Sequence, residues 1–202
     1  MTGILLAAGQ GRRFGADKLL APLPSGEALA LAAARKLRDG LRQAAGDRVR
    51  LLAVLRPEQI LLAGLLTQAG YDVVLSDEAR TGMGRSLAQG VAASREAEGW
   101  LVALADMPAI LPGTIARVAE ALRNGASLAA PFHGGRRGHP VGFSQAWREE
   151  LLALEGDAGA RHLLQNAGPA LLRIATDDSG VLMDVDTPMD INALKGNDTR
   201  LH

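Results

Sequence analysis

Several residue types are scarce or missing in this 202-residue chain, and each absence excludes a class of protein. Without cysteine there is neither a disulfide framework nor a thiolate metal site, and we expect a reducing, cytoplasmic location. Aromatic residues make up only 3%, too few for platforms that stack single-stranded nucleic acid. Basic and acidic residues number 22 each, so no net charge attracts nucleic acid or an anionic membrane.

Long hydrophobic runs and common catalytic signatures are also missing. No apolar stretch approaches the roughly 18 residues of a membrane span, and no basic segment precedes an apolar one at the N-terminus. We therefore expect neither a membrane partner nor a signal peptide. Neither G-x-S-x-G nor H-E-x-x-H occurs, and no cysteine is present as a nucleophile, so covalent acyl chemistry has no candidate site.

The order of apolar and amphipathic segments predicts the fold class. Short runs rich in Val and Leu alternate with amphipathic stretches, as in βαβ units whose helices cover both faces of a sheet. Strands are predicted at residues 3–7, 49–55, 73–76, 100–105 and 128–131, and helices at 27–45, 57–69, 85–95, 112–124, 145–154 and 159–166. We expect a three-layer α/β fold with a mostly parallel, doubly wound (Rossmann-like) sheet.

The same pattern indicates the domain organisation. Residues 1–196 are expected to form a single domain, with a first part over 1–131 and a second over 132–186. The second part, rich in Gly and Arg at its start, is expected to add an antiparallel strand. Residues 197–202 are polar and are expected to fray.

Proline and glycine mark the expected helix ends. Pro57 and Pro112 suit the first turn of a helix, where the missing N–H has no partner to lose. Gly70, Gly99 and Gly125 fall where helices are expected to stop.

A loop near the N-terminus combines glycines with cations, in "ILLAAGQGRRFGADK" at residues 4–18. Gly9, Gly11 and Gly15 are one residue too widely spaced for the dinucleotide fingerprint, and Lys18 is not followed by the Ser or Thr of a P-loop. Glycines let backbone N–H groups approach phosphate, Arg13 offers a planar fork, and Lys18 a point charge. The loop therefore favours binding of a triphosphate or its pyrophosphate leaving group over an ordinary turn with solvated cations.

Two aspartates are expected at the carboxyl edge of the sheet, where ligands of open α/β sheets bind. Asp106 and Asp186 each follow an apolar run, and a pair of carboxylates near phosphate suits Mg²⁺ or Mn²⁺. The alternative is that each caps the following turn. For Asp184 we favour a cap or a salt bridge.

Three further segments are candidates for ligand contact. In residues 80–91 the start of a helix, with Gly82 and Gly84, could hold an anion or a base edge through main-chain groups; a plain turn is about equally favoured. In residues 133–143 a basic patch of His133, Arg136, Arg137 and His139 could receive an anionic acceptor, although a solvated loop would explain it too. In residues 155–161, helix capping explains Asp157 but does not explain Arg161.

Taken together, a cationic phosphate loop and a pair of metal-binding carboxylates predict phosphoryl or nucleotidyl transfer. At this point the chain resembles the MobA-like nucleotidyltransferases. "LLAAGQGRRFGADK" is similar to the L-A-A-G-x-x-x-R-x-G-x-x-K signature, and "LADMP", "GHPVGF", "GDAGAR" and "DVDTPMD" are similar to later motifs in the same order. The resemblance spans residues 3–195 and is strongest to molybdenum cofactor cytidylyltransferases, because the loop reads A-A-G where the guanylyl branch tends to L-A-G-G.

The resemblance implies an activity and a set of site residues. CMP would pass from CTP to the phosphate of molybdopterin, with release of pyrophosphate, and a transient contact with a molybdenum hydroxylase or its chaperone would deliver the product. Arg13, Lys18 and Asp106 would be catalytic, and Asp106 and Asp186 would hold the metal. The implied nucleotide-binding residues are Leu6, Ala7, Ala8, Gly9, Gly11, Arg13, Lys18, Gly82, Met83, Gly84 and Ser86. The implied acceptor-binding residues are Arg137, His139, Pro140, Asp157 and Arg161.

Other functions remain open at this stage. The nucleotide could be GTP, or the acceptor another small phosphate such as a sugar phosphate or an isoprenoid precursor. A non-catalytic cofactor-delivery module is disfavoured because both Asp106 and Asp186 are present. A dinucleotide-dependent oxidoreductase is disfavoured by the long glycine loop and by Arg56 and Pro57, which stand where an acidic residue should end the second strand. Arg12 and Phe14 depart from the usual signature residues.

Overall fold

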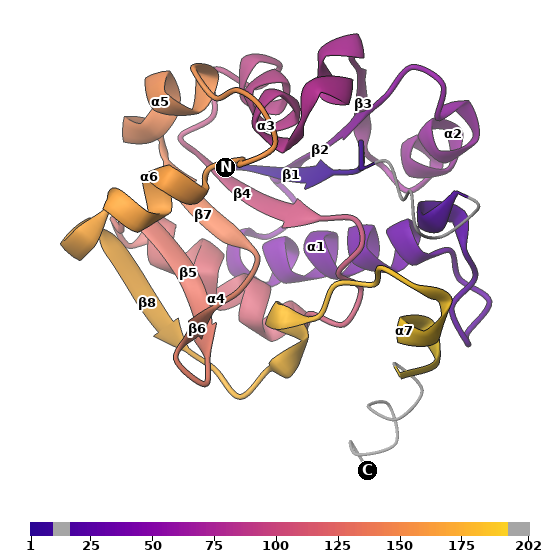
Figure 1. The fold of residues 1–202 in the computed structure, drawn as a ribbon. Coiled ribbons are helices and arrows are strands. Elements are labelled where there is room, and N and C mark those ends of the chain that lie inside the picture. Colours follow the sequence, from indigo (N-terminus) through magenta and orange to yellow (C-terminus); the bar gives the residue numbers. More distant parts are fainter. Residues whose placement is uncertain (10–16, 194–202) are drawn as a thin grey trace.

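The fold is built on one mixed β-sheet. The computed structural model describes residues 1–9 and 17–193, which form an eight-stranded sheet with helices on both faces (Figure 1). The strands run in the order β3-β2-β1-β4-β7-β5-β6, and β8 pairs with β5. Their bounds are β1 Thr2–Leu6, β2 Arg50–Leu55, β3 Asp72–Leu75, β4 Gly99–Leu104, β5 Leu128–His133, β6 Arg136–Arg137, β7 Val141–Ser144 and β8 Leu171–Ala175. The helices are α1 Leu29–Ala45, α2 Ile60–Gln68, α3 Met83–Ala92, α4 Pro112–Arg123, α5 Arg148–Leu152, α6 Arg161–Asn166 and α7 Pro188–Ala193.

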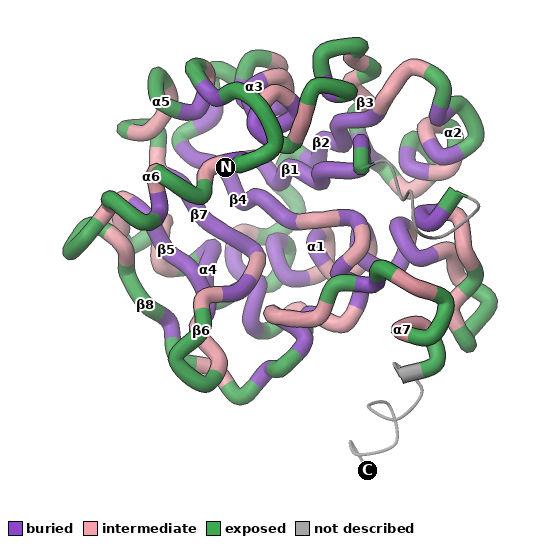
Figure 2. The backbone as a smooth tube through the Cα atoms, viewed as in Figure 1, coloured by how far each residue is buried: buried purple, intermediate pink, exposed green. Residues whose placement is uncertain are grey.

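The predicted three-layer α/β arrangement is confirmed. Helices α1, α2 and α4 pack on one face of the sheet, and α3, α5 and α6 pack on the other. The central strands β2, β1, β4, β7 and β5 are the most buried part of the described chain (Figure 2), as expected when both faces are covered. Gly40 on α1 lets α4 approach closely, because a Cβ there would overlap Ile115. No helix of residues 1–9 and 17–193 is both long and apolar enough to cross a membrane.

The direction of the strands changes in the middle of the sheet. β3, β2, β1 and β4 are parallel, whereas β7 runs antiparallel to both β4 and β5, which confirms the expected antiparallel strand. The register pairs Val102 with Val141. The amino end of β7 therefore lies at the same edge as the carboxyl ends of β1 and β4, and residues before β7 can join the ligand site.

Some predicted helix ends are confirmed and others are wrong. Pro112 opens α4, and Gly70 and Gly125, both with positive φ, follow α2 and α4 closely. Gly99 was expected to stop a helix, but α3 already ends at Ala92 and Gly99 begins β4. Pro57 lies before α2, which starts at Ile60.

The buried side chain of Gln59 explains the late start of α2. It accepts a hydrogen bond from the Arg56 N–H at 2.9 Å and donates one to the Ala7 carbonyl at 3.0 Å. This places the turn before α2 against the end of β1, so the helix cannot begin until the turn is complete.

The segment that carries Asp186 is not the strand end that the sequence suggested. A short 3-10 helix, η5 (Ser179–Leu182), is capped by the buried Asp178, and irregular backbone follows it. The Val185 N–H donates to the Asp106 carbonyl at 2.9 Å, which places the two segments side by side. Asp184 is exposed and lies four residues before α7, so the predicted helix cap is wrong. No salt bridge joins it to another described residue, and the alternative of a salt bridge stays a prediction.

Candidate active site

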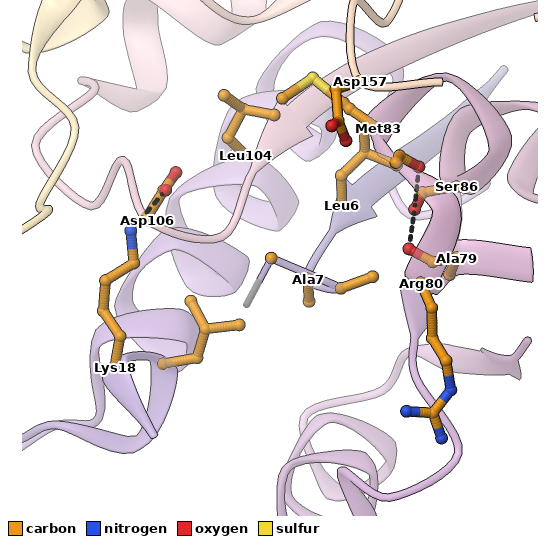
Figure 3. A pocket seen from close by; sticks show the side chains of 14 residues that line it. Leu6, Ala7, Lys18, Ala79, Arg80, Met83, Ser86, Leu104, Asp106 and Asp157 are labelled. Carbon is orange, nitrogen blue, oxygen red and sulfur yellow. Dashed lines mark hydrogen bonds and ion pairs between the residues drawn. The ribbon is translucent and has the colours of Figure 1, made fainter. Parts of the chain in front are cut away.

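Lys18 joins two distant carboxylates at the edge of the sheet. Its ammonium donates to Asp106 Oδ2 at 2.9 Å and to Asp186 Oδ1 at 3.0 Å; Figure 3 shows the first of these pairs. The exposed fraction is 9% for the Lys18 side chain, 25% for Asp106 and 50% for Asp186. Burial lowers the pKa of Lys18, but Asp106 and then Asp186 outweigh it and the pKa is raised above 10.5. Lys18 is therefore charged at neutral pH.

The position of Lys18 follows from its local structure. It begins the short helix η1 (Lys18–Leu20), and Asp17 caps this turn by accepting a hydrogen bond from the Leu19 N–H at 3.2 Å. Leu19 is buried and anchors η1 in the core beneath α1. The ammonium is thus held by a fixed turn and faces the two carboxylates.

The donor set of Asp106 and Asp186 fits a divalent cation. Oxygens from two separate segments converge on a single positive charge, which is the arrangement that a hard metal ion requires. In residues 1–9 and 17–193 no group of three or more His, Cys, Asp or Glu side chains gathers as a metal site. Two carboxylates without further protein ligands suit Mg²⁺ or Mn²⁺, which keep water and substrate phosphates in their shell, and do not suit a structural zinc.

A cavity of about 450 Å³ extends from this cluster across the edge of the sheet. In Figure 3, Lys18 and Asp106 lie at one end, Arg80 and Ser86 at the other, and Leu6 and Ala7 between them. Its lining comprises Leu6, Ala7, Ala8, Gly9, Lys18, Leu19, Ala79, Arg80, Gly82, Met83, Ser86, Leu104, Asp106 and Asp157. Nine of these were expected in the nucleotide or metal site. Gly11 and Arg13 lie outside the described residues.

The glycines at the start of α3 serve packing. Gly82 has φ +137°, and a Cβ there would overlap the Gly156 carbonyl. The Gly84 N–H donates to the Gly156 carbonyl at 2.8 Å, and the Ser86 N–H donates to the Gly82 carbonyl at 3.1 Å. Because these two N–H groups are already bonded, neither is available to the anion that the sequence suggested. The contact instead fixes Asp157 in the cavity wall.

A second cavity, of about 210 Å³, adjoins the first and shares Leu6, Met83, Leu104 and Asp157 with it. The remaining lining residues are Leu87, Val102, Arg137, His139, Val141, Phe143, Ala158, Ala160, Arg161 and Leu164. Four of the five predicted acceptor residues line it. The sequence also predicted that Asp157 caps a helix. This prediction is wrong, because α6 begins four residues later, at Arg161. Neither Pro140 nor Gly84 lines either cavity.

The basic patch of the sequence is divided by the strand geometry. Arg137 and His139 line the smaller cavity, whereas Arg136 is exposed and His133 contacts the Thr176 carbonyl through Nδ1 at 3.1 Å. Arg137 Nη1 and His139 Nδ1 are buried without a hydrogen-bond partner. Burial, with Arg161 nearby, lowers the pKa of Arg137. Burial, with Arg137 nearby, lowers the pKa of the histidine to about 4, so its ring is neutral at physiological pH.

Sequence reasoning missed the apolar walls and Arg80. Val102 and Leu104 alternate on β4, Val141 and Phe143 alternate on β7, and the strands are neighbours, so the period-two pattern was the available signal. Arg80 forms a salt bridge with Asp77, three residues earlier, and another with Glu58 at 2.7 Å, which no local pattern indicates.

Known proteins resemble this chain over nearly its whole length. Residues 3–173 match the MobA-like NTP transferase domain. Nicotine blue oxidoreductase of Paenarthrobacter nicotinovorans is 30% identical over 195 residues, which cover 93% of this chain and 92% of that protein. The purine catabolism protein PucB of Bacillus subtilis (strain 168) is also 30% identical, over 96% of both chains.

Solved structures show the same similarity. The crystal structure of Rv0371c from Mycobacterium tuberculosis H37Rv superposes with a TM-score of 0.81 at 28% identity, covering 98% of both chains. The structure of its complex with manganese gives a TM-score of 0.71 at 29% identity, covering 97% of this chain and 98% of that one.

Proposed function

Because the chain belongs to the MobA-like NTP transferase family of nucleotidyltransferases, we propose that it transfers CMP from CTP to the phosphate of molybdopterin. The products are molybdopterin cytosine dinucleotide and pyrophosphate. The observation that carries the proposal is the cluster of Lys18, Asp106 and Asp186 at one end of a cleft that opens into a second, separately lined cavity. A phosphate-handling centre beside two cavities suits a reaction between two substrates.

In this proposal the larger cavity binds CTP. The triphosphate lies at the end with Lys18 and Asp106, and the ribose and base lie toward Met83 and Ser86. Arg13 and Gly11, implied by the resemblance to contact the nucleotide, lie outside the described residues. Ala7 and Ala8 have short, buried side chains that form the floor of the nucleotide site. Their similarity to the A-A-G sequence of cytidylyl enzymes favours cytosine as the base.

The reaction needs charge stabilisation more than covalent help from the protein. An oxygen of the acceptor phosphate attacks the α-phosphorus of CTP in line, the bond from that phosphorus to the bridging oxygen of the β-phosphate breaks, and pyrophosphate leaves with the electron pair. Lys18 neutralises charge on the leaving group. Asp106 and Asp186 would hold Mg²⁺ or Mn²⁺, which supplies further neutralisation of phosphate charge when bound. The manganese complex of Rv0371c supports a divalent cation.

The smaller cavity binds the acceptor. Its apolar walls and its two arginines, Arg137 and Arg161, suit a ring system that carries an anionic group. Leu6 and Leu104 border both cavities, so the two substrates would meet across these side chains. Delivery of the product by transient contact with a molybdenum hydroxylase or its chaperone is part of this proposal.

A redox function is the second candidate, because one relative that is 30% identical over 93% of this chain is named nicotine blue oxidoreductase. An oxidoreductase would use the same cleft for a nicotinamide or flavin cofactor and the smaller cavity for a flat substrate.

Nucleotide-dependent pyrophosphate release separates these functions. Purified protein is incubated with molybdopterin, Mg²⁺ and either CTP or GTP, and parallel reactions replace molybdopterin with sugar phosphates or an isoprenoid phosphate. We expect release with CTP and molybdopterin only, and its loss in Asp106→Ala. Release with GTP alone would overturn the base assignment. A further reaction contains a reduced nicotinamide cofactor, and its oxidation without pyrophosphate release would favour the redox function.

A further inference from the structure

The smaller cavity contains two polar atoms that the protein leaves without partners. In residues 1–9 and 17–193, four buried side-chain nitrogens lack a hydrogen-bond partner, and two of them, Arg137 Nη1 and His139 Nδ1, belong to residues that line this one cavity. Buried polar groups are nearly always bonded, and an unpaired one is costly. Two in one cavity therefore indicate a ligand that completes them.

The charges around the cavity define what such a ligand must offer. Arg137 forms no salt bridge with another described residue, although Asp157 lines the same cavity, and the charge that acts on its pKa is Arg161, a like charge. A guanidinium only donates hydrogen bonds, so Arg137 requires an acceptor atom. The neutral ring of His139 can take either role, depending on its tautomer.

Apart from Asp157 and Arg161, the remaining lining is apolar, and several of its large side chains come from two neighbouring strands. Val102 and Leu104 of β4, with Val141 and Phe143 of β7, cover one side, and Leu164 of α6 covers another. A volume of about 210 Å³ is below the range of pockets that enclose a whole drug-sized ligand, so it suits one ring system of a larger molecule.

The backbone around the histidine is fixed before any ligand binds. The His139 N–H donates to the Val181 carbonyl at 3.0 Å, and the Gly138 N–H donates to the Pro131 carbonyl at 2.8 Å. Gly138 lies so close to Val181 that a Cβ would overlap it. Donor positions that are set in advance give selectivity, because a ligand without matching atoms leaves them unpaired.

We propose that Arg137 and His139 are a specificity pair which selects a flat heterocycle bearing a hydrogen-bond acceptor atom beside a second polar atom along one edge, and that this ring binds without nucleotide or metal. The inference deepens the proposed function, on which it rests for the identity of the ring as a pterin. Arg137 donates a hydrogen bond to a carbonyl oxygen or ring nitrogen of that edge, and His139 forms a hydrogen bond with the neighbouring polar atom. The strands cover the faces of the ring.

Fluorescence titration with free pterin tests the pair directly. Naphthalene serves as a probe of similar shape without a polar edge, and neither CTP nor metal is added. We expect pterin to bind and naphthalene to bind at least tenfold more weakly. Arg137→Leu should weaken pterin binding about 10- to 100-fold, as loss of a hydrogen bond to a charged group does. His139→Phe should weaken it less, and His139→Asn should recover part of that loss.

Arg136→Leu is the matched control, since it removes an adjacent arginine that is exposed outside the cavity. Unchanged CTP binding shows that each variant is folded. Equal pterin binding in Arg137→Leu and the unchanged protein, or an equal loss in Arg136→Leu, would overturn the proposal.

The same variants separate this inference from the proposed function. Arg137-dependent binding of pterin without any CMP transfer would support the specificity pair and refute the transferase reaction. CMP transfer to molybdopterin with an unchanged acceptor KM in Arg137→Leu would support the reaction and refute the pair.

Discussion

Replacing Lys18 by methionine removes the charge between Asp106 and Asp186 while keeping an apolar chain of similar length. The two carboxylates then face each other without a cation, and their repulsion destabilises the fold. Each hydrogen bond to the ammonium is worth about 1.5–3 kcal/mol, and the half-exposed Asp186 gains less than that because solvent screens it. We expect a net loss of roughly 2–3 kcal/mol, which is about 4–12 °C in Tm for a protein of this size.

The loss should be present throughout neutral pH. Because the pKa of Lys18 is raised in the folded protein, its contribution is complete below the ordinary value of 10.5 and is lost only as the pH rises beyond it. Thermal unfolding at pH 7.5 therefore compares the two proteins where the lysine is fully charged.

Divalent cations should reverse the destabilisation. In the unchanged protein a metal ion competes with Lys18 for the same oxygens, so Mn²⁺ without nucleotide should raise Tm little. In Lys18→Met the competitor is gone, and the Mn²⁺ midpoint should fall about 10- to 100-fold, the equivalent of the lost charged hydrogen bonds. Lys36→Met on α1 removes a cation elsewhere and should leave both quantities unchanged.

Two results would refute this reasoning. If Lys18→Met is as stable as the unchanged protein, the lysine does not neutralise the pair. If Mn²⁺ stabilises both proteins equally, the metal and the ammonium do not share these oxygens.

Three further predictions concern single residues. Gly82→Ala should destabilise the protein by at least about 2 kcal/mol, because of its positive φ and the overlap with Gly156, whereas Gly64→Ala on the exposed side of α2 should stabilise it by about 0.5–1 kcal/mol; urea unfolding compares them. The pKa of His139 is lowered from 6.5 to about 4, so the unfolded chain binds the proton at a higher pH than the folded protein does. The free energy of unfolding should therefore fall by about 3 kcal/mol as the pH drops from 6.5 to about 4, and an equal fall of Tm in His139→Gln would contradict this. Asp178→Ala should lower the free energy of unfolding by about 2–4 kcal/mol, because it leaves the backbone N–H groups of Leu111 and Gly180 unpaired. Asp177→Ala is the control in the same urea unfolding experiment.

The parallel half of the sheet was predictable because local sequence determines it. Strands β1, β2 and β4 contain uninterrupted apolar runs that are buried on both faces, and few other structures accommodate such runs. The carboxyl-edge rule then places Lys18 and Asp106 correctly.

The rest of the site depends on contacts between distant residues. Asp186 was expected at a strand end, yet it reaches the site through a hydrogen bond from Val185 to the Asp106 carbonyl, across 79 residues of sequence. Gly82 lines the larger cavity, as expected, but its lack of a side chain is explained by Gly156, which only the folded chain brings near. The metal-binding and phosphate-binding roles of these residues stay predictions.

The reversal of β7 has a consequence for how this protein can acquire new substrates. Loops that follow parallel strands lead into crossover helices, so a change there disturbs the packing of a whole layer. Arg137 and His139 instead precede β7, in the short connection from β5 to β7 that contains β6 and no crossover helix. Mutations in that connection can reshape one cavity while the Lys18 end of the cleft keeps its geometry. Under the proposed function, the choice of acceptor and the handling of triphosphate would be encoded in separate pieces of the chain, which could evolve at different rates.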